Sequence, residues 1–185
     1  MSRKDATRAP KKLIPAGLPP ELVSTGEEAD RLHESALYSG QGQFEQMKLW
    51  RTMNLVLGVP AAVLAAVAGG TGLAAKGHTL VPGILALIAA GFGAALTTLN
   101  PSRRVTQSQT AANAYLELQT AIRQFLLIDL GTSKVPDARD RLSELTALRD
   151  EVNKQADPPG WYARSRANRS ILSGGQTYEI DTKRD

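Results

Sequence analysis

Uncharged residues fill the middle of this 185-residue chain, and charged residues are concentrated toward its two ends. Residues 53–100 include a single charged residue, Lys76. Around it, the uncharged runs 52–75 and 79–99 would extend about 36 and 31 Å as helices at 1.5 Å per residue. The hydrocarbon core of a bilayer is about 30 Å thick. The pattern therefore predicts a transmembrane hairpin, with helices over 53–75 and 79–100 and a tight turn between them.

The alternative is a buried helical hairpin inside a soluble protein. Ala and Gly make up 11 of the 23 residues from 53 to 75, so the hydrophobicity of this run is moderate and favours that alternative. Helices in soluble cores are nevertheless seldom uncharged on every face over such a length. The membrane hairpin is the better interpretation, and we expect an all-α membrane protein.

Basic residues and one tryptophan flank the uncharged block, as the positive-inside rule and the aromatic belt of membrane proteins require. We take as membrane-flanking Lys48, Trp50, Arg51, Arg103 and Arg104. The turn between the two runs contains only one basic residue. This imbalance predicts a hairpin with both termini in the cytoplasm; an inverted hairpin is the alternative.

The flanking regions read as helical. Residues 1–26 are basic and Pro-rich, which predicts a disordered tail. Apolar positions at helical spacing predict a cytoplasmic helix over 27–52 and a cytoplasmic helical hairpin over 102–156, whose two helices are antiparallel. Residues 158–180 are expected to form a short basic helix and tail.

Small residues recur at every fourth position of the first run, and such stripes let helices in lipid approach closely. We expect this helix-packing stripe to mediate association, although it also reflects the composition: Gly58, Ala62, Ala66, Gly70 and Ala74. The second run has Ala86, Ala90, Ala94 and Thr98 at the same interval. Asn100-Pro101 ends the second helix, because a residue before proline avoids the helical region, and Pro101 is a predicted hinge.

Residues suited to catalysis or metal binding are few. The chain has no Cys and two His, so a thiolate site and a multi-His metal centre are excluded. His33 is expected on the surface, and no nucleophile lies near a base. Gly70-x-Gly72 does not follow a strand and no acid follows at the spacing of a dinucleotide site. We therefore predict no enzymatic activity, no cofactor and no metal. A net charge of +4 is too small to indicate nucleic-acid binding, so we also predict no nucleic-acid partner.

A basic segment with aromatic residues lies near the C-terminus. Arg164, Arg166 and Arg169 follow Trp161 and Tyr162. Arginines beside aromatic rings can contact lipid headgroups or an anionic ligand. The alternative is an ordinary solvated helix face, and the sequence leaves this open.

The order of several segments resembles the SLATT family, the two-transmembrane effectors of bacterial nucleotide-signalling conflict systems. The resemblance covers roughly residues 25–180 and rests on 44–51 (FEQMKLWR), 57–65 (LGVPAAVLA), 99–102 (LNPS), Asn113, Tyr115, Arg123, Phe125, Leu142-x-x-Leu145-x-x-x-Arg149, Pro158-Pro159-Gly160-Trp161 and Tyr178. It implies an antiphage effector in the bacterial inner (cytoplasmic) membrane that forms or opens pores when an immune signal arrives, with a nucleotide second messenger or a signalling protein as partner.

A single hairpin cannot enclose water, so a pore made by this chain would be a homo-oligomer in the lipid bilayer. The uncharged runs provide no ring of Asp, Glu or Arg, which predicts poor ion selectivity. Candidate pore-lining residues are Thr71, Thr97, Thr98 and Asn100. The alternative function is a non-conducting membrane-anchored adaptor whose cytoplasmic helices bind a partner protein.

Overall fold

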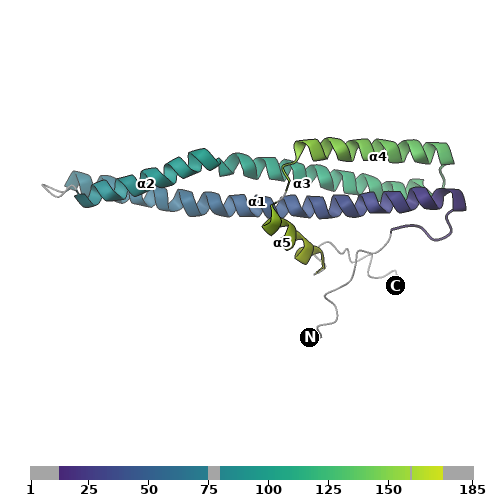
Figure 1. Ribbon diagram of the computed structural model, residues 1–185, viewed down its shortest axis with the longest axis horizontal. Coiled ribbons are helices and arrows are strands. Elements are labelled where there is room, and N and C mark those ends of the chain that lie inside the picture. Colours follow the sequence, from purple (N-terminus) through teal and green to yellow (C-terminus); the bar gives the residue numbers. More distant parts are fainter. Residues whose placement is uncertain (1–12, 75–79, 159, 173–185) are drawn as a thin grey trace, which may run out of the picture. The chain divides into compact units, whose positions relative to one another are not determined.

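The computed structural model describes residues 13–74, 80–158 and 160–172, and within these ranges it contains helices and no strand (Figure 1). The elements are α1 (Pro20–Ala74), α2 (Leu80–Leu99), α3 (Pro101–Gln124), the π-helical turn η1 (Phe125–Asp129), α4 (Val135–Gln155) and α5 (Trp161–Leu172). The prediction of an all-helical chain with two long apolar helices is confirmed. The predicted turn at Lys76, residues 1–12 and Tyr178 lie outside the described residues.

The chain divides into two compact units. The bundle unit comprises Met1–Gln46 and Gln107–Asp185, and the hairpin unit comprises Met47–Thr106. The boundaries fall within α1 and within α3, so each of these helices contributes residues to both units.

The bundle unit is held together by buried residues at seven-residue intervals. On α1 these are Leu22, Ala29, Ala36 and Gln43, and on α4 they are Ala138, Leu145 and Val152. An interval of seven places side chains along one seam of a helix, as in coiled coils. Tyr115, Leu118, Ile122 and Phe125 supply the matching seam of α3 and η1. The core of the bundle unit is therefore a packing of three helices.

Contacts along these helices give their directions. A Cβ added at Gly40 would lie 3.1 Å from the Tyr115 Cβ, and one at Gly26 would lie 3.2 Å from Leu130 Cδ2, so α1 and α3 are antiparallel. Arg149 Nη2 donates to Ser35 Oγ over 3.3 Å, and Gln43 Nε2 donates to the Asp157 carbonyl, so α4 runs parallel to α1. Because Gly40 has no Cβ, it permits the close approach of α1 and α3.

The hairpin unit pairs α1 and α2 in an antiparallel arrangement with a constant register. A Cβ at Gly58 would lie 3.8 Å from Leu96 Cδ1, and a Cβ at Gly72 would lie 3.8 Å from the Pro82 Cβ. At the start of α3, Ser102 Oγ lies 3.4 Å from Asn54 Oδ1. These contacts lie toward the two ends of the unit, so both ends of α2 approach α1.

Asn100 separates α2 from α3 and caps both helices. Its φ of 44° is in the left-handed region, which Asn adopts more readily than most residues and which commonly ends a helix. Its N–H donates to the Leu96 carbonyl at 2.9 Å, its carbonyl accepts from the Arg104 N–H at 3.3 Å, and its Oδ1 accepts from the Arg103 N–H at 3.4 Å. Pro101 is buried and begins α3, where its missing N–H costs nothing. The predicted hinge position is thus a break of one residue.

Several predicted boundaries were wrong. α1 begins at Pro20 rather than at residue 27, because Pro20 suits a first helical position and Glu21 favours the positive end of the helix dipole. The expected helices 27–52 and 53–75 form one continuous helix, since a change in side-chain polarity leaves the backbone hydrogen bonds intact. Pro60 lies inside this helix and removes one backbone N–H donor from its hydrogen-bond ladder. The expected hairpin 102–156 includes η1, in which the Leu130 N–H bonds the Phe125 carbonyl at 2.8 Å.

The double cap predicts the effect of substitutions at Asn100. Asn100→Val loses the side-chain acceptor and forces a β-branched residue to positive φ, so we expect a loss of about 2–3 kcal/mol in the free energy of unfolding. Asn100→Gly loses the acceptor alone and should cost a few tenths of a kcal/mol. Thermal unfolding of the full chain in detergent, followed by circular dichroism, measures both.

The matched control is Thr97→Val, which replaces an exposed residue of α2 one turn earlier and should leave the melting temperature nearly unchanged. Equal melting temperatures for Asn100→Val and Asn100→Gly would contradict the role assigned to the backbone at this position.

Candidate functional site

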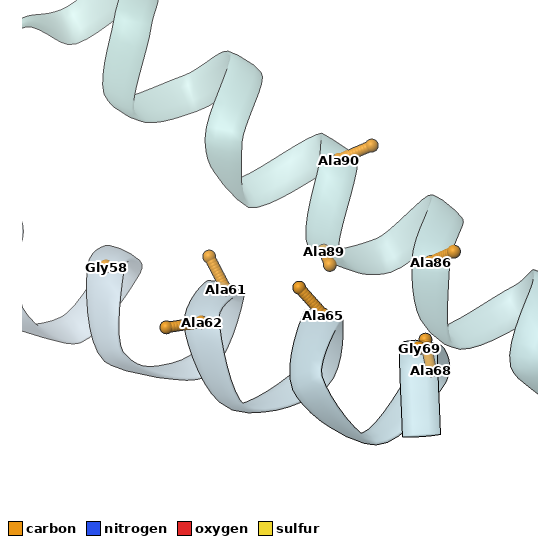
Figure 2. A pocket seen from close by; sticks show the side chains of 9 residues that line it. All are labelled: Gly58, Ala61, Ala62, Ala65, Ala68, Gly69, Ala86, Ala89 and Ala90. Atoms are coloured by element: carbon orange, nitrogen blue, oxygen red, sulfur yellow. The ribbon is translucent and has the colours of Figure 1, made fainter. Parts of the chain in front are cut away.

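An open apolar groove of about 740 Å³ lies between the facing sides of α1 and α2 (Figure 2). Its nine lining residues are all Gly or Ala: Gly58, Ala61, Ala62, Ala65, Ala68, Gly69, Ala86, Ala89 and Ala90. No side chain in this set extends beyond Cβ, so the groove offers no acid, base or nucleophile. It can accommodate an apolar surface, and it cannot perform chemistry.

The apolar side chains of the hairpin unit point away from the rest of the chain. Leu73 is 93% exposed, and Leu80 and Leu87 are each 74% exposed. In the most apolar 18-residue windows, 6% of α1 is buried and none of the helical run beginning at Leu80 is buried. A core helix of a soluble protein would be mostly buried. The chain therefore has two helices that are long and apolar enough to cross a membrane and whose apolar surface is open.

The predicted helix-packing stripe does not lie on one face of α1. Gly58 and Ala62 line the groove, whereas Ala66 and Gly70 are exposed, and a Cβ at Gly70 would meet nothing within 4 Å. Residues spaced by four advance about 40° per step around a helix of 3.6 residues per turn. The stripe therefore winds from the α2 side onto the open surface on its way to Ala74, the last residue of α1.

The candidate pore-lining residues are not gathered at one level of the hairpin. In the observed register Thr71 lies opposite the start of α2, about 21 Å along the helix from Thr97 and Thr98. Each hydroxyl donates to its own helix: Thr71 to the Val67 carbonyl at 2.7 Å, Thr97 to Gly93 at 3.0 Å and Thr98 to Ala94 at 2.9 Å. These bonds satisfy the hydroxyls without water, and Asn100 is occupied as a cap.

The membrane-flanking residues come together where α1 enters the hairpin unit and α3 leaves it. The Arg104 guanidinium lies over the Trp50 ring, 4.8 Å from its centroid, and Lys48, Arg51 and Arg103 are exposed. We call these five residues the basic collar. The sequence from 47 to 106 contains no acidic residue, so every formally charged residue of the hairpin unit is basic. Such a collar suits a surface facing anionic phosphates.

A buried polar cluster in the bundle unit was not predicted. Gln43, Glu45, Gln46 and Ser108 are buried, and the Glu45 side chain is 5% exposed. Arg166 of α5 neutralises Glu45, with its Nε 3.1 Å from the carboxylate, and also donates to the Tyr162 hydroxyl at 3.1 Å. Gln43 and Gln46 continue the buried seam of α1, which is the signal that could have identified them. The sequence contains no corresponding signal for the pairing of Glu45 with Arg166.

The expectation that His33 is a surface residue was wrong. The residue is partly buried, and among the described residues its Nε2 has no hydrogen-bond partner. Burial lowers the pKa of His33, the nearby Asp30 opposes this, and Arg123 adds to the lowering. Burial in the folded bundle unit therefore favours the neutral form of the His33 imidazole.

The described residues contain no group of three or more His, Asp or Glu able to hold a metal ion. Comparison of the chain with models of known protein families, with curated proteins and with solved structures found no match. The assignment of a function therefore rests on the exposed apolar hairpin and the basic collar.

The lowered pKa of His33 predicts a pH-dependent stability. As the pH falls below about 6.5, the unfolded chain binds a proton at this residue that the folded chain rejects, so stability decreases until the pH passes the folded pKa. We expect the full chain to melt at a lower temperature at mildly acidic than at neutral pH, with a smaller difference for His33→Gln. His78 is present in both proteins, so its contribution cancels; equal differences would contradict the prediction.

The Glu45–Arg166 pair predicts a non-additive pair of substitutions. Arg166→Gln removes the guanidinium that lies 3.1 Å from a buried carboxylate, which is more destabilising than removing both charges. Hydrogen exchange in α5 should therefore be faster in Arg166→Gln than in the double variant with Glu45→Gln. Asn168→Gln, at an exposed position of the same helix, is the control and should exchange like the unchanged protein.

Proposed function

We propose that this protein is a bacterial inner-membrane effector that oligomerises into a poorly selective pore when an immune signal activates it. The observation that carries the proposal is the exposed apolar surface of both hairpin helices, which water solvates poorly and lipid tails solvate well. The basic collar at one end of the hairpin unit and the resemblance of the sequence to SLATT effectors support it. Both termini then lie in the cytoplasm, on the same side of the membrane as the collar.

Oligomerisation follows from geometry. Two helices cannot surround a water-filled passage, so several copies must line it. Association in lipid depends on close packing of small residues, and Ala66 and Gly70 present such positions on the open surface of α1. The oligomer is therefore proposed to form through this part of the stripe, while Gly58 is engaged with Leu96 within one copy.

Poor selectivity follows from the polar groups available. The hairpin unit has no acidic residue, and its threonine hydroxyls are bonded to their own helices. A passage lined by such helices would lack the charged or carbonyl rings that discriminate among ions. The proposed trigger is a nucleotide second messenger or a signalling protein that acts on the bundle unit and moves the Asn100-Pro101 break.

A second function, a non-conducting adaptor, is favoured by one specific observation. Since Thr71, Thr97 and Thr98 satisfy their hydroxyls internally, the helices are compatible with lipid on every side and require no water-filled passage. In this case the hairpin anchors the bundle unit, which binds a partner protein.

Dye entry into activated cells distinguishes the two functions. Cells expressing the protein with its neighbouring genes and the activating signal should take up a membrane-impermeant dye and lose membrane potential. Ala66→Leu should abolish both effects, because it adds bulk at the open part of the stripe without touching the groove. Gly58→Leu should also abolish them, through crowding against Leu96.

The matched control is Gly91→Leu, which adds the same bulk to α2 where a Cβ would meet nothing within 4 Å. Dye uptake should persist in this variant. Unchanged membrane potential in activated cells that contain the unmodified protein would overturn the pore and leave the adaptor.

A further inference from the structure

The outward face of α5 has an exposed aromatic pair. Trp161 is 82% exposed and Tyr162 is 45% exposed, and their rings meet edge to face with centroids 5.9 Å apart. Ala163 and Ala167 are 2% exposed and form the opposite, docked face. A tryptophan exposed to this extent is unusual on a surface that only water contacts, because the indole is among the most apolar side chains.

The orientation of α5 is fixed on the bundle unit. Its two buried alanines dock one face, and Arg166 holds Glu45 of α1 from the flank. With 100° per residue, Trp161 and Arg169 each lie about 140° around the helix from the midpoint of the two alanines. The same docking that buries Ala163 and Ala167 thus presents Trp161 and Arg169 outward.

All the charged residues of α5 are positive. α5 contains Arg164, Arg166 and Arg169 and no acidic residue. Arg166 is neutralised by Glu45, whereas Arg164 and Arg169 are exposed and no acidic partner is found for them within the described residues. α4 differs, since its arginines alternate with acids and Arg141 pairs with Glu144 at 2.7 Å. The α5 face therefore attracts anions where the α4 surface does not.

We infer that the outward face of α5 binds the anionic headgroups of a lipid bilayer, with the Trp161 indole in the interfacial layer and Arg164 and Arg169 on the phosphates. Tryptophan is enriched at this depth of membranes, and each arginine near an anionic surface contributes favourably. Two arginines alone would suit a free phosphate ion, but the exposed indole beside them suits a layer that is partly apolar.

The position in the sequence of Glu45, the residue that Arg166 of α5 contacts, supports a membrane rather than another anionic surface as the partner of α5. Glu45, which α5 holds, precedes Lys48 of the basic collar by three residues and Trp50 by five. The inference rests on the proposed insertion of the hairpin, since that insertion brings the collar to the headgroups.

Trp161 fluorescence of the full chain in nanodiscs tests the inference. Trp50→Phe removes the only other tryptophan, so emission reports on Trp161 alone. In discs of equal parts phosphatidylglycerol and phosphatidylcholine we expect blue-shifted emission, quenching by brominated lipid and protection from acrylamide. In discs of phosphatidylcholine alone, emission should be red-shifted and acrylamide should quench it.

Variants separate headgroup binding from a general property of the chain. Arg164→Gln and Arg169→Gln, in the same background, should each weaken the association of α5 with anionic discs about fivefold. Arg139→Gln and Arg141→Gln on α4 are the matched controls and should leave emission unchanged. Inorganic phosphate added to phosphatidylcholine discs should not shift the emission.

Three results would overturn the inference: emission that does not depend on phosphatidylglycerol, equal effects of the α4 and α5 variants, or a full blue shift with inorganic phosphate alone. The last would identify a soluble-anion site. A chain that inserts into discs and leaves Trp161 open to acrylamide disproves the α5 contact alone. A chain that remains soluble without detergent and does not incorporate into discs disproves the proposed membrane function itself.

Discussion

The arrangement of this molecule depends on the apolar surface that α1 and α2 leave uncovered. Leucines that are 74% to 93% exposed on the hairpin are left uncovered by the residues that the structure describes. Exposure of that apolar surface to water costs about 25 cal/mol per Å². The cost is removed only where an apolar solvent, such as lipid tails, or another apolar protein surface covers these side chains. The absence of acids from 47 to 106 and the basic residues at one end of the hairpin unit are the features expected of helices that end at an anionic interface.

The two units use different means of helix packing. In the bundle unit, buried side chains at intervals of seven fill the space between three helices, and Leu118, Ile122 and Phe125 are almost completely covered. In the hairpin unit, Gly and Ala allow close approach and leave a groove. Water drives the first kind of packing through burial of apolar area, whereas in lipid only close contact between helices is available. The same chain thus uses large buried side chains to pack the helices of one unit and small residues to pack the helices of the other.

The limits of the uncharged hairpin were predictable, and much of the site was not. The runs ending near Ala75 and Leu99 match the ends of α1 and α2 within a residue, because charges and an Asn-Pro pair mark them. The start of α1 was missed since prolines were taken as a sign of disorder, although Pro is favoured at the first helical position. The Glu45–Arg166 pair joins residues 121 positions apart and depends on how α5 docks, which no local pattern encodes.

The joint at Asn100 restricts how the hairpin unit can rearrange. A peptide plane is rigid, so a connection of one residue between two helices has only two soft torsion angles, φ and ψ. Both are set here by three hydrogen bonds and by the ring of the following proline. A large displacement of α2 relative to the first turn of α3 must break at least one of these bonds, so the joint is a stiff connection and not a flexible tether.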